Sequence, residues 1–81
     1  MTYNRALNLL RRSGRMKAAN EALRAIAPLC EDDNDREFAL HTYKRRVDII
    51  CERRAVIDGR QNRAAEHVAK AARMLGVTLA D

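Results

Sequence analysis

Aromatic residues, prolines and glycines are scarce in this chain of 81 residues: it has no tryptophan, two tyrosines, one phenylalanine, one proline and three glycines. Because β-sandwiches and barrels need many turns and strands rich in aromatic and β-branched residues, this composition argues against an all-β fold. No apolar run approaches the roughly 18 residues that a membrane span needs. The first ten residues also lack the basic-then-apolar pattern of a signal peptide. We therefore expect a soluble helical protein with no membrane partner.

Cysteine is almost absent, and the two that occur, Cys30 and Cys51, are too few for a disulfide scaffold and do not have zinc-ligand spacing. If the second and third helices are antiparallel neighbours, these thiols lie about 24 Å apart, beyond the roughly 7 Å between Cα atoms that a disulfide allows. His41 and His67 belong to no ligand cluster, and no glycine-rich phosphate loop exists. The sequence predicts two separate thiols, with Cys51 partly buried, in a cytoplasmic protein without metal, cofactor or enzymatic activity.

Four helical segments are predicted from apolar residues spaced at i, i+3 and i+4. They run over about 2–12, from the Ser13-Gly14 break to 29, over 35–57 and over 61–75. Thr2 is the expected N-cap of the first segment, and Asn34 with Glu37 three residues later indicates a capping box before the third. Gly59 and Gly76 end the last two segments, since glycine is the usual residue just past a helix C-terminus.

A faint internal repeat predicts how these helices are arranged. Gly14-Arg15 recurs as Gly59-Arg60 about 45 residues later, each time followed by an Ala-rich helix. The sequence therefore predicts an all-α fold: a compact four-helix domain over 1–76, built as two αα-hairpins with the third helix longest and central. A loose tail is expected over 77–81. A domain this small is often stabilised by self-association, so we also expect a homo-dimer or another small homo-oligomer.

The expected core residues fall on one side of each helix. They are Tyr3, Ala6, Leu7, Leu10, Met16, Ala19, Leu23, Ile26, Ala27, Leu40, Tyr43, Val47, Ile50, Cys51, Ile57, Ala64, Val68, Ala71, Ala72 and Leu75. Pro28 makes the last turn of the second helix doubtful, because proline lacks the N–H that a helix interior needs.

The third helix carries a second apolar face, formed by Phe38, Ile49 and Val56, when successive residues are placed about 100° apart. A central helix covered on both sides would explain it, and so would an interface with a partner or a second copy. Arginines flank this face, and their flat guanidinium groups pair well with carboxylates at interfaces. The candidate interface residues are Phe38, Thr42, Arg45, Arg46, Ile49, Arg53 and Val56.

The formal net charge of +5 favours acidic partners, either nucleic acid or an acidic protein surface. An Arg- and Ala-rich chain also arises from a GC-rich genome, so the charge has a compositional explanation as well. The candidate anion or nucleic-acid contacts are Arg11, Arg12, Arg15, Lys17, Lys44, Arg60 and Arg63. Acidic residues interleave with these basic ones, as on an ordinary solvated helical surface, and aromatics for base stacking are lacking.

The sequence therefore favours a non-enzymatic regulator or adaptor that docks an Arg-rimmed helical surface onto an acidic protein partner. Small Ala/Arg-rich helical proteins of this type occur among phage and mobile-element regulators and inhibitors of host proteins. A basic nucleic-acid-binding accessory protein is the alternative, and a helical structural subunit is the third.

Overall fold

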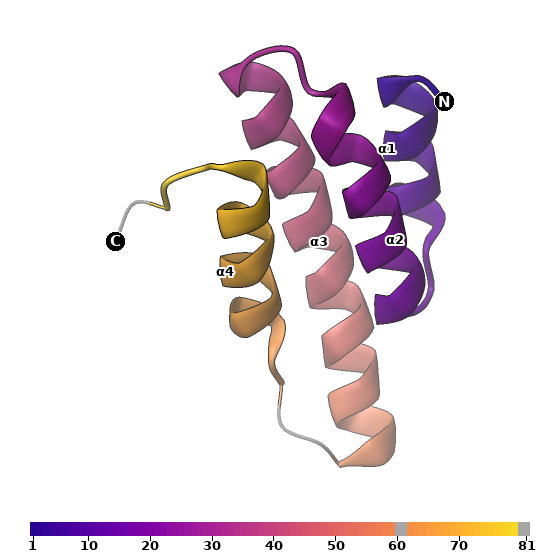
Figure 1. Ribbon diagram of the computed structural model, residues 1–81. Coiled ribbons are helices and arrows are strands. Elements are labelled where there is room, and N and C mark those ends of the chain that lie inside the picture. The colour runs from indigo at the N-terminus through magenta and orange to yellow at the C-terminus, as the bar shows by residue number, and fades with distance from the viewer. Residues whose placement is uncertain (60–61, 80–81) are drawn as a thin grey trace.

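The structure, a computed structural model, describes residues 1–59 and 62–79, and within these ranges it is helical with no strand (Figure 1). The elements are α1 (Tyr3–Arg12), α2 (Met16–Ile26), the 3-10 helix η1 (Ala27–Leu29), α3 (Asp33–Asp58) and α4 (Ala64–Leu75). The predicted all-α fold is confirmed. In the described part of the chain, no helix is both long enough and apolar enough to cross a membrane.

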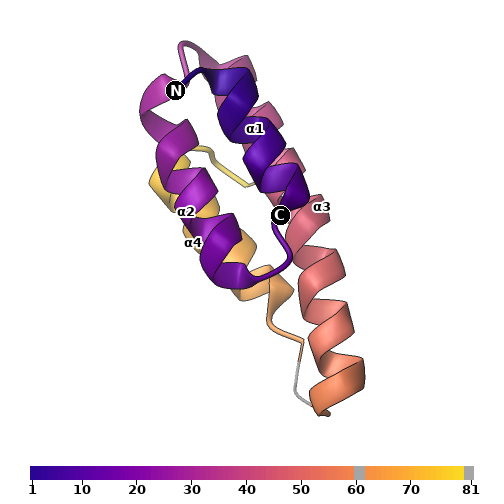
Figure 2. The same cartoon turned by 90° about the vertical axis from the view of Figure 1, so that its right-hand side faces the viewer.

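The helices form two hairpins, α1 with α2 and α3 with α4, and α3 also packs against both α1 and α2. The predicted hairpin layout and the central, longest third helix are therefore confirmed. The Cα atoms occupy a slab of 39 × 30 × 14 Å, which is about two helices thick. In so thin a molecule no helix is enclosed on all sides. The C-terminal end of α3 extends beyond the other helices in both views (Figures 1 and 2).

Three helix ends lie where the sequence predicted them. The Thr2 hydroxyl accepts a hydrogen bond from the Arg5 backbone N–H at 3.2 Å and so caps α1. Gly59 and Gly76 adopt the left-handed conformation, with φ of 65° and 76°, directly after α3 and α4. Glycine adopts this conformation without the steric cost that a Cβ atom brings.

The predicted capping box at the start of α3 is wrong. The N-cap is Asp32, whose carboxylate accepts a hydrogen bond from the Asp35 N–H at 2.9 Å, and Asn34 lies inside the first turn. Asp32, Asp33, Asn34 and Asp35 are all of residue types that favour the N-cap position. The earlier start also places the carboxylates of Asp33 and Asp35 in the first turn, where the helix dipole favours negative charge.

Two other helix boundaries also differ from prediction. The α-helical part of α2 ends at Ile26, and residues 27–29 close with a 3-10 turn that contains Pro28. α4 begins at Ala64 rather than 61, and the Asn62 side chain accepts a hydrogen bond from the Ala64 N–H at 2.9 Å. Asparagine favours such local side-chain bonds over helical continuation, which accounts for the later start.

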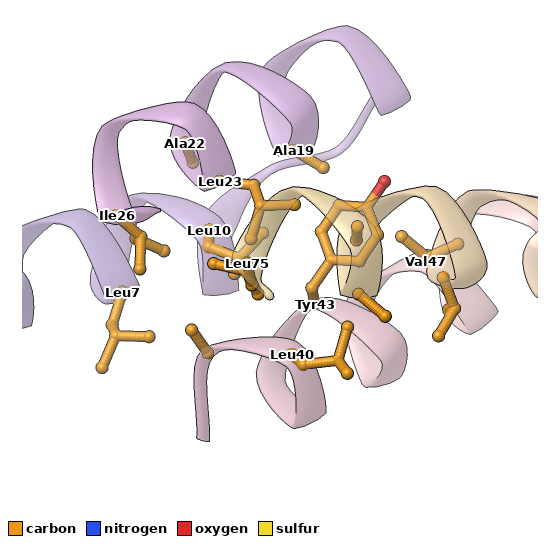
Figure 3. Close-up of a cluster of buried hydrophobic side chains, with 14 of the residues drawn as sticks. Leu7, Leu10, Ala19, Ala22, Leu23, Ile26, Leu40, Tyr43, Val47 and Leu75 are labelled. Atoms are coloured by element: carbon orange, nitrogen blue, oxygen red, sulfur yellow. The ribbon is translucent and has the colours of Figure 1, made fainter. Parts of the chain in front are cut away.

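The core lies between the two hairpins, with Tyr43 and Leu23 among its fully buried side chains (Figure 3). The Tyr43 ring lies within the cluster, and its hydroxyl donates a 2.6 Å hydrogen bond to Asn20 Oδ1 of α2. Tyr3 similarly ties α1 to the start of α3, because its hydroxyl donates to the Asp35 carbonyl at 2.7 Å. These two bonds join the hairpins at two separate points.

The expected core is confirmed with one clear exception. Ile57 is 73% exposed, because it lies on the overhanging end of α3 where no other described helix faces it. Tyr3, Met16 and Ala27 are partly buried at the edge of the core. The buried set also includes Ala22 and Ala39, which were not predicted.

The cysteines and the tail complete the fold. Cys30 and Cys51 are separate thiols, and Cys51 is buried, as predicted. In the expected loose tail, Val77 packs against the core and its N–H donates to the Ala72 carbonyl at 2.9 Å, whereas Leu79 is exposed. The last two residues, 80–81, lie outside the described residues.

Candidate functional site

The outer face of α3 carries a row of side chains that are exposed except at Thr42, which is buried. We call it the outer row, and its members alternate in steps of four and three residues: Phe38, Thr42, Arg45, Ile49, Glu52 and Val56. Phe38, Ile49 and Val56 are 47%, 46% and 80% exposed. The explanation in which a central helix is covered on both sides is therefore wrong for this chain, because about half or more of each side chain remains exposed, although Arg11 of α1 lies over the Phe38 ring.

A hollow of about 460 Å³ opens on this face, and we call it the arginine hollow. It is lined by Arg11, Phe38, His41, Thr42, Arg45, Arg46 and Ile49. Arg11 comes from the last turn of α1, which runs in the same direction as the first half of α3 (Figure 1). The hollow therefore lies at the junction of two helices rather than on one.

Two of its guanidinium groups are held in place by their neighbours. The Arg11 guanidinium lies over the Phe38 ring, 5.8 Å from the centroid, and its Nη1 donates to Asn8 Oδ1 at 3.1 Å. Arg46 donates from Nη2 to the carbonyl oxygen of Arg11. That carbonyl belongs to the last turn of α1, where the helix dipole favours a cation. Positive charge at this place is therefore stabilised by the fold.

The floor of the hollow is Thr42, which is 8% exposed and donates from its hydroxyl to the Phe38 carbonyl at 2.9 Å. Among the described residues no carboxylate pairs with Arg11, Arg45 or Arg46; the ion pair recorded there joins Arg36 to Asp33 at 3.0 Å. Three guanidinium groups thus surround a concave surface to which the described residues supply no counter-ion. Such an arrangement attracts anionic groups.

The structure brings together most of the candidate interface residues but few of the candidate anion contacts. Arg53 is exposed beside the outer row, and only Arg11 of the anion-contact set reaches the hollow. Arg12, Arg15 and Lys17 lie at the turn between α1 and α2, and Arg63 precedes α4. Arg60 lies outside the described residues.

A second hollow, of about 500 Å³, lies between α3, α4 and the C-terminal tail. Lys44, a candidate anion contact, lines it together with Glu37 and Asp48, and Val68 and Leu79 add apolar lining. Because acidic and basic groups are both present, this hollow has no net preference for an anion. Sequence reasoning missed it, since it depends on how α4 and the tail lie against α3.

The thiols have no activating environment. Burial raises the pKa of Cys51 above its ordinary value, and the nearby Asp48 carboxylate adds to the effect. Burial and then Asp35 raise the pKa of Cys30 in the same way. A thiol with a raised pKa is a poor nucleophile at neutral pH. Within the described residues, no three His, Cys, Asp or Glu side chains gather in a group that could hold a metal ion.

The predicted interface residues do not include three members of this surface, Arg11, His41 and Glu52. Arg11 was predicted only as an anion contact. The alternation of four and three residues that includes Glu52 is visible in the sequence and could have identified it. No sequence signal places Arg11 beside Phe38.

Comparisons of the chain with protein families, with curated proteins and with solved structures find no match.

Proposed function

We propose that this protein is a non-enzymatic binding protein that docks the outer face of α3 onto an acidic surface of a protein partner. In this role it acts as a regulator or inhibitor, because occupying a surface blocks whatever else binds there. The observation that carries the proposal is the arginine hollow, which has three guanidinium groups, no carboxylate in its lining and exposed apolar side chains around it. Arginine and aromatic residues around a desolvated centre are the usual anchors of protein interfaces.

The distribution of charge supports a protein partner over nucleic acid. A nucleic-acid duplex is bound through phosphates spread along an extended basic surface. Here Arg12, Arg15, Lys17 and Arg63 lie on other elements than the outer row, and Glu52 belongs to the row itself. The net charge of +5 nevertheless supports nucleic-acid binding as the second candidate function.

One binding experiment tests both candidates. Fluorescence anisotropy would compare a labelled amphipathic helical peptide rich in Glu and Leu, the same peptide with Gln in place of Glu, and a labelled DNA duplex, at low and near-physiological salt. We expect the Glu peptide to bind in preference to the Gln peptide. Arg45→Ala should weaken this binding by roughly 10-fold, the range for one hydrogen bond to a charged group.

The matched control is Arg73→Ala, which removes an exposed arginine from α4 and should leave peptide binding unchanged. Equal binding of the Glu and Gln peptides, or equal losses in the two variants, would contradict the proposal. Duplex binding that persists at near-physiological salt while the peptide fails to bind would support the nucleic-acid function instead.

A further inference from the structure

The residues of the outer row are arranged almost symmetrically along the sequence about Ile49. Thr42 and Val56 lie seven residues to either side of Ile49, and both are β-branched. Arg45 and Glu52 lie four residues before and three residues after Ile49, and they carry opposite charges. Read backwards from Ile49, Thr42 therefore corresponds to Val56, and Arg45 corresponds to Glu52 to within one residue.

We propose that the outer row pairs with the outer row of a second copy in antiparallel orientation, centred near Ile49, with Glu52 of each copy entering the arginine hollow of the other. In this pairing Ile49 packs against Ile49, and Thr42 lies opposite Val56. Arg45 lies opposite Glu52 of the second copy, and the two-fold symmetry forms this pair twice.

The charges select this orientation over the parallel one. A parallel pairing would bring Arg45 against Arg45 and Glu52 against Glu52, and like charges facing each other across an interface cost several kcal/mol. In the described part of the chain neither Arg45 nor Glu52 has an ion-pair partner. Both are exposed, so they are available to one another between copies.

The overhanging end of α3 fits the same pairing. The C-terminal end of α3 extends past the other helices (Figures 1 and 2), and Val56 and Ile57 near this end are 80% and 73% exposed. An antiparallel pair brings this end alongside the first half of the other copy's α3, where α1 borders it and the arginine hollow opens. The exposed Val56 side chain of the outer row thereby gains neighbours from the second copy.

The length over which the two α3 helices pair determines the expected affinity of the dimer. From Thr42 to Val56 the paired part of the row spans about 21 Å at 1.5 Å per residue. A helix pair of this length makes an interface at the small end of the range for specific complexes. We therefore expect a reversible dimer with a dissociation constant on the order of micromolar.

This inference rests on the proposed function, because it assigns a second copy to the face that an acidic partner would occupy. The dimer then competes with that partner, and Glu52 of the second copy takes the place of the partner's carboxylate. Binding to an acidic partner would therefore release the monomer from the dimer.

A charge exchange measured by sedimentation equilibrium tests the pairing on the full chain. The wild-type protein should dimerise with rising concentration. Arg45→Glu and Glu52→Arg should each weaken the dimer by roughly 10-fold or more, as expected for close charge pairs at an interface. The double variant R45E/E52R should regain most of the wild-type affinity, because each pair is restored with its signs exchanged.

Arg54→Glu is the control, since it reverses an exposed charge on the same end of α3 but outside the outer row, and it should leave the dimer unchanged. Circular dichroism of each variant checks that it is folded. A wild-type protein that stays monomeric at roughly millimolar concentration, far above the expected constant, would overturn the inference. A double variant that remains as weak as the single ones would also overturn it.

The two proposals fail in different ways. If the wild-type chain is monomeric while Arg45→Ala still weakens binding of the Glu peptide, the dimer is wrong and the proposed function stands. If R45E/E52R restores the dimer but no variant binds the peptide, the dimer stands and the function is wrong. When both hold, the double variant should dimerise yet bind the Glu peptide poorly.

Discussion

The two faces of α3 contain similar apolar residues but have opposite surroundings. On the inner face Tyr43 and Val47 are 2% and 0% exposed, whereas on the outer face Ile49 and Val56 are 46% and 80% exposed. The difference comes from which neighbours each face has and not from its own hydrophobicity. An apolar helix face therefore indicates that burial is favourable, but the rest of the chain decides whether that burial happens within one copy.

The polar groups of the two faces differ in the same way. On the inner face the Tyr43 hydroxyl is paired with Asn20, and within the described residues no buried side-chain nitrogen or oxygen lacks a partner. On the outer face Arg45 and Glu52 are exposed and have no ion-pair partner among the described residues. The polar groups of the inner face are thus paired within the chain, whereas these two charges of the outer face are exposed to solvent.

Among the variants that test the difference between the two faces, Val47→Asp should have the largest effect on stability. It places a carboxylate at a position that is 0% exposed, within the cluster of buried apolar side chains. We expect a loss of about 3–5 kcal/mol, which is comparable to the whole stability of a domain of this size. Circular dichroism and thermal unfolding would show an unfolded or barely folded chain. A variant that melts like the wild type would mean that the inner face is not the core.

Tyr43→Phe should have an intermediate effect, because it removes only the hydrogen bond to Asn20. The expected loss is about 1 kcal/mol at neutral pH, measured by urea unfolding. Burial, with a smaller contribution from Cys51, raises the pKa of Tyr43 above its ordinary value. The folded state therefore holds this proton to a higher pH than the unfolded state, where the pKa is about 10.

The difference between the pKa of Tyr43 in the folded and unfolded states determines how stability changes with pH. Above about pH 10 the folded state binds more protons than the unfolded one, so the free energy of unfolding falls as pH rises. The stability linked to Tyr43 is thus fully present below that pH and lost above it. Tyr43→Phe should lose stability less steeply in this alkaline range than the wild type. Identical alkaline slopes would contradict a protonated, buried Tyr43.

Ile49→Asp should have the smallest effect on the monomer, since Ile49 is about half exposed. We expect its free energy of unfolding, measured in dilute solution, to change by about 0.5 kcal/mol or less. At high concentration the same variant should fail to dimerise, because it places two carboxylates beside each other at the centre of the pairing. Unfolding of this variant would show that Ile49 supports the core and that the two faces do not differ as described.

The helices and their inner faces could be predicted from the sequence, because apolar spacing and end residues such as Thr2 and Gly59 act locally. Ile57 could not, since its exposure depends on α3 being longer than the helices beside it. The start of α3 was misassigned because neighbouring carboxyl and amide side chains compete for one cap. Local rules rank such residues almost equally.

Only the part of the candidate site that lies on a single helix could be predicted from the sequence. Phe38, Ile49 and Val56 were recognised as one apolar face from helical geometry alone, whereas its exposure was left open. The arginine hollow was not recognised, because it needs Arg11 from α1 and therefore the packing of α1 beside α3. Packing between distant segments depends on the shapes of both segments. The periodicity of one segment alone therefore does not predict it.

The hairpin layout has a consequence for how the chain folds. The most extensive packing joins helices that are adjacent in sequence, so most contacts close short loops. Chains with such low contact order fold within microseconds to milliseconds. The outer row takes almost no part in these contacts, and its side chains can therefore change in evolution with little effect on folding speed. Substitutions in the outer row can therefore accompany changes in a binding partner while the helical scaffold stays the same.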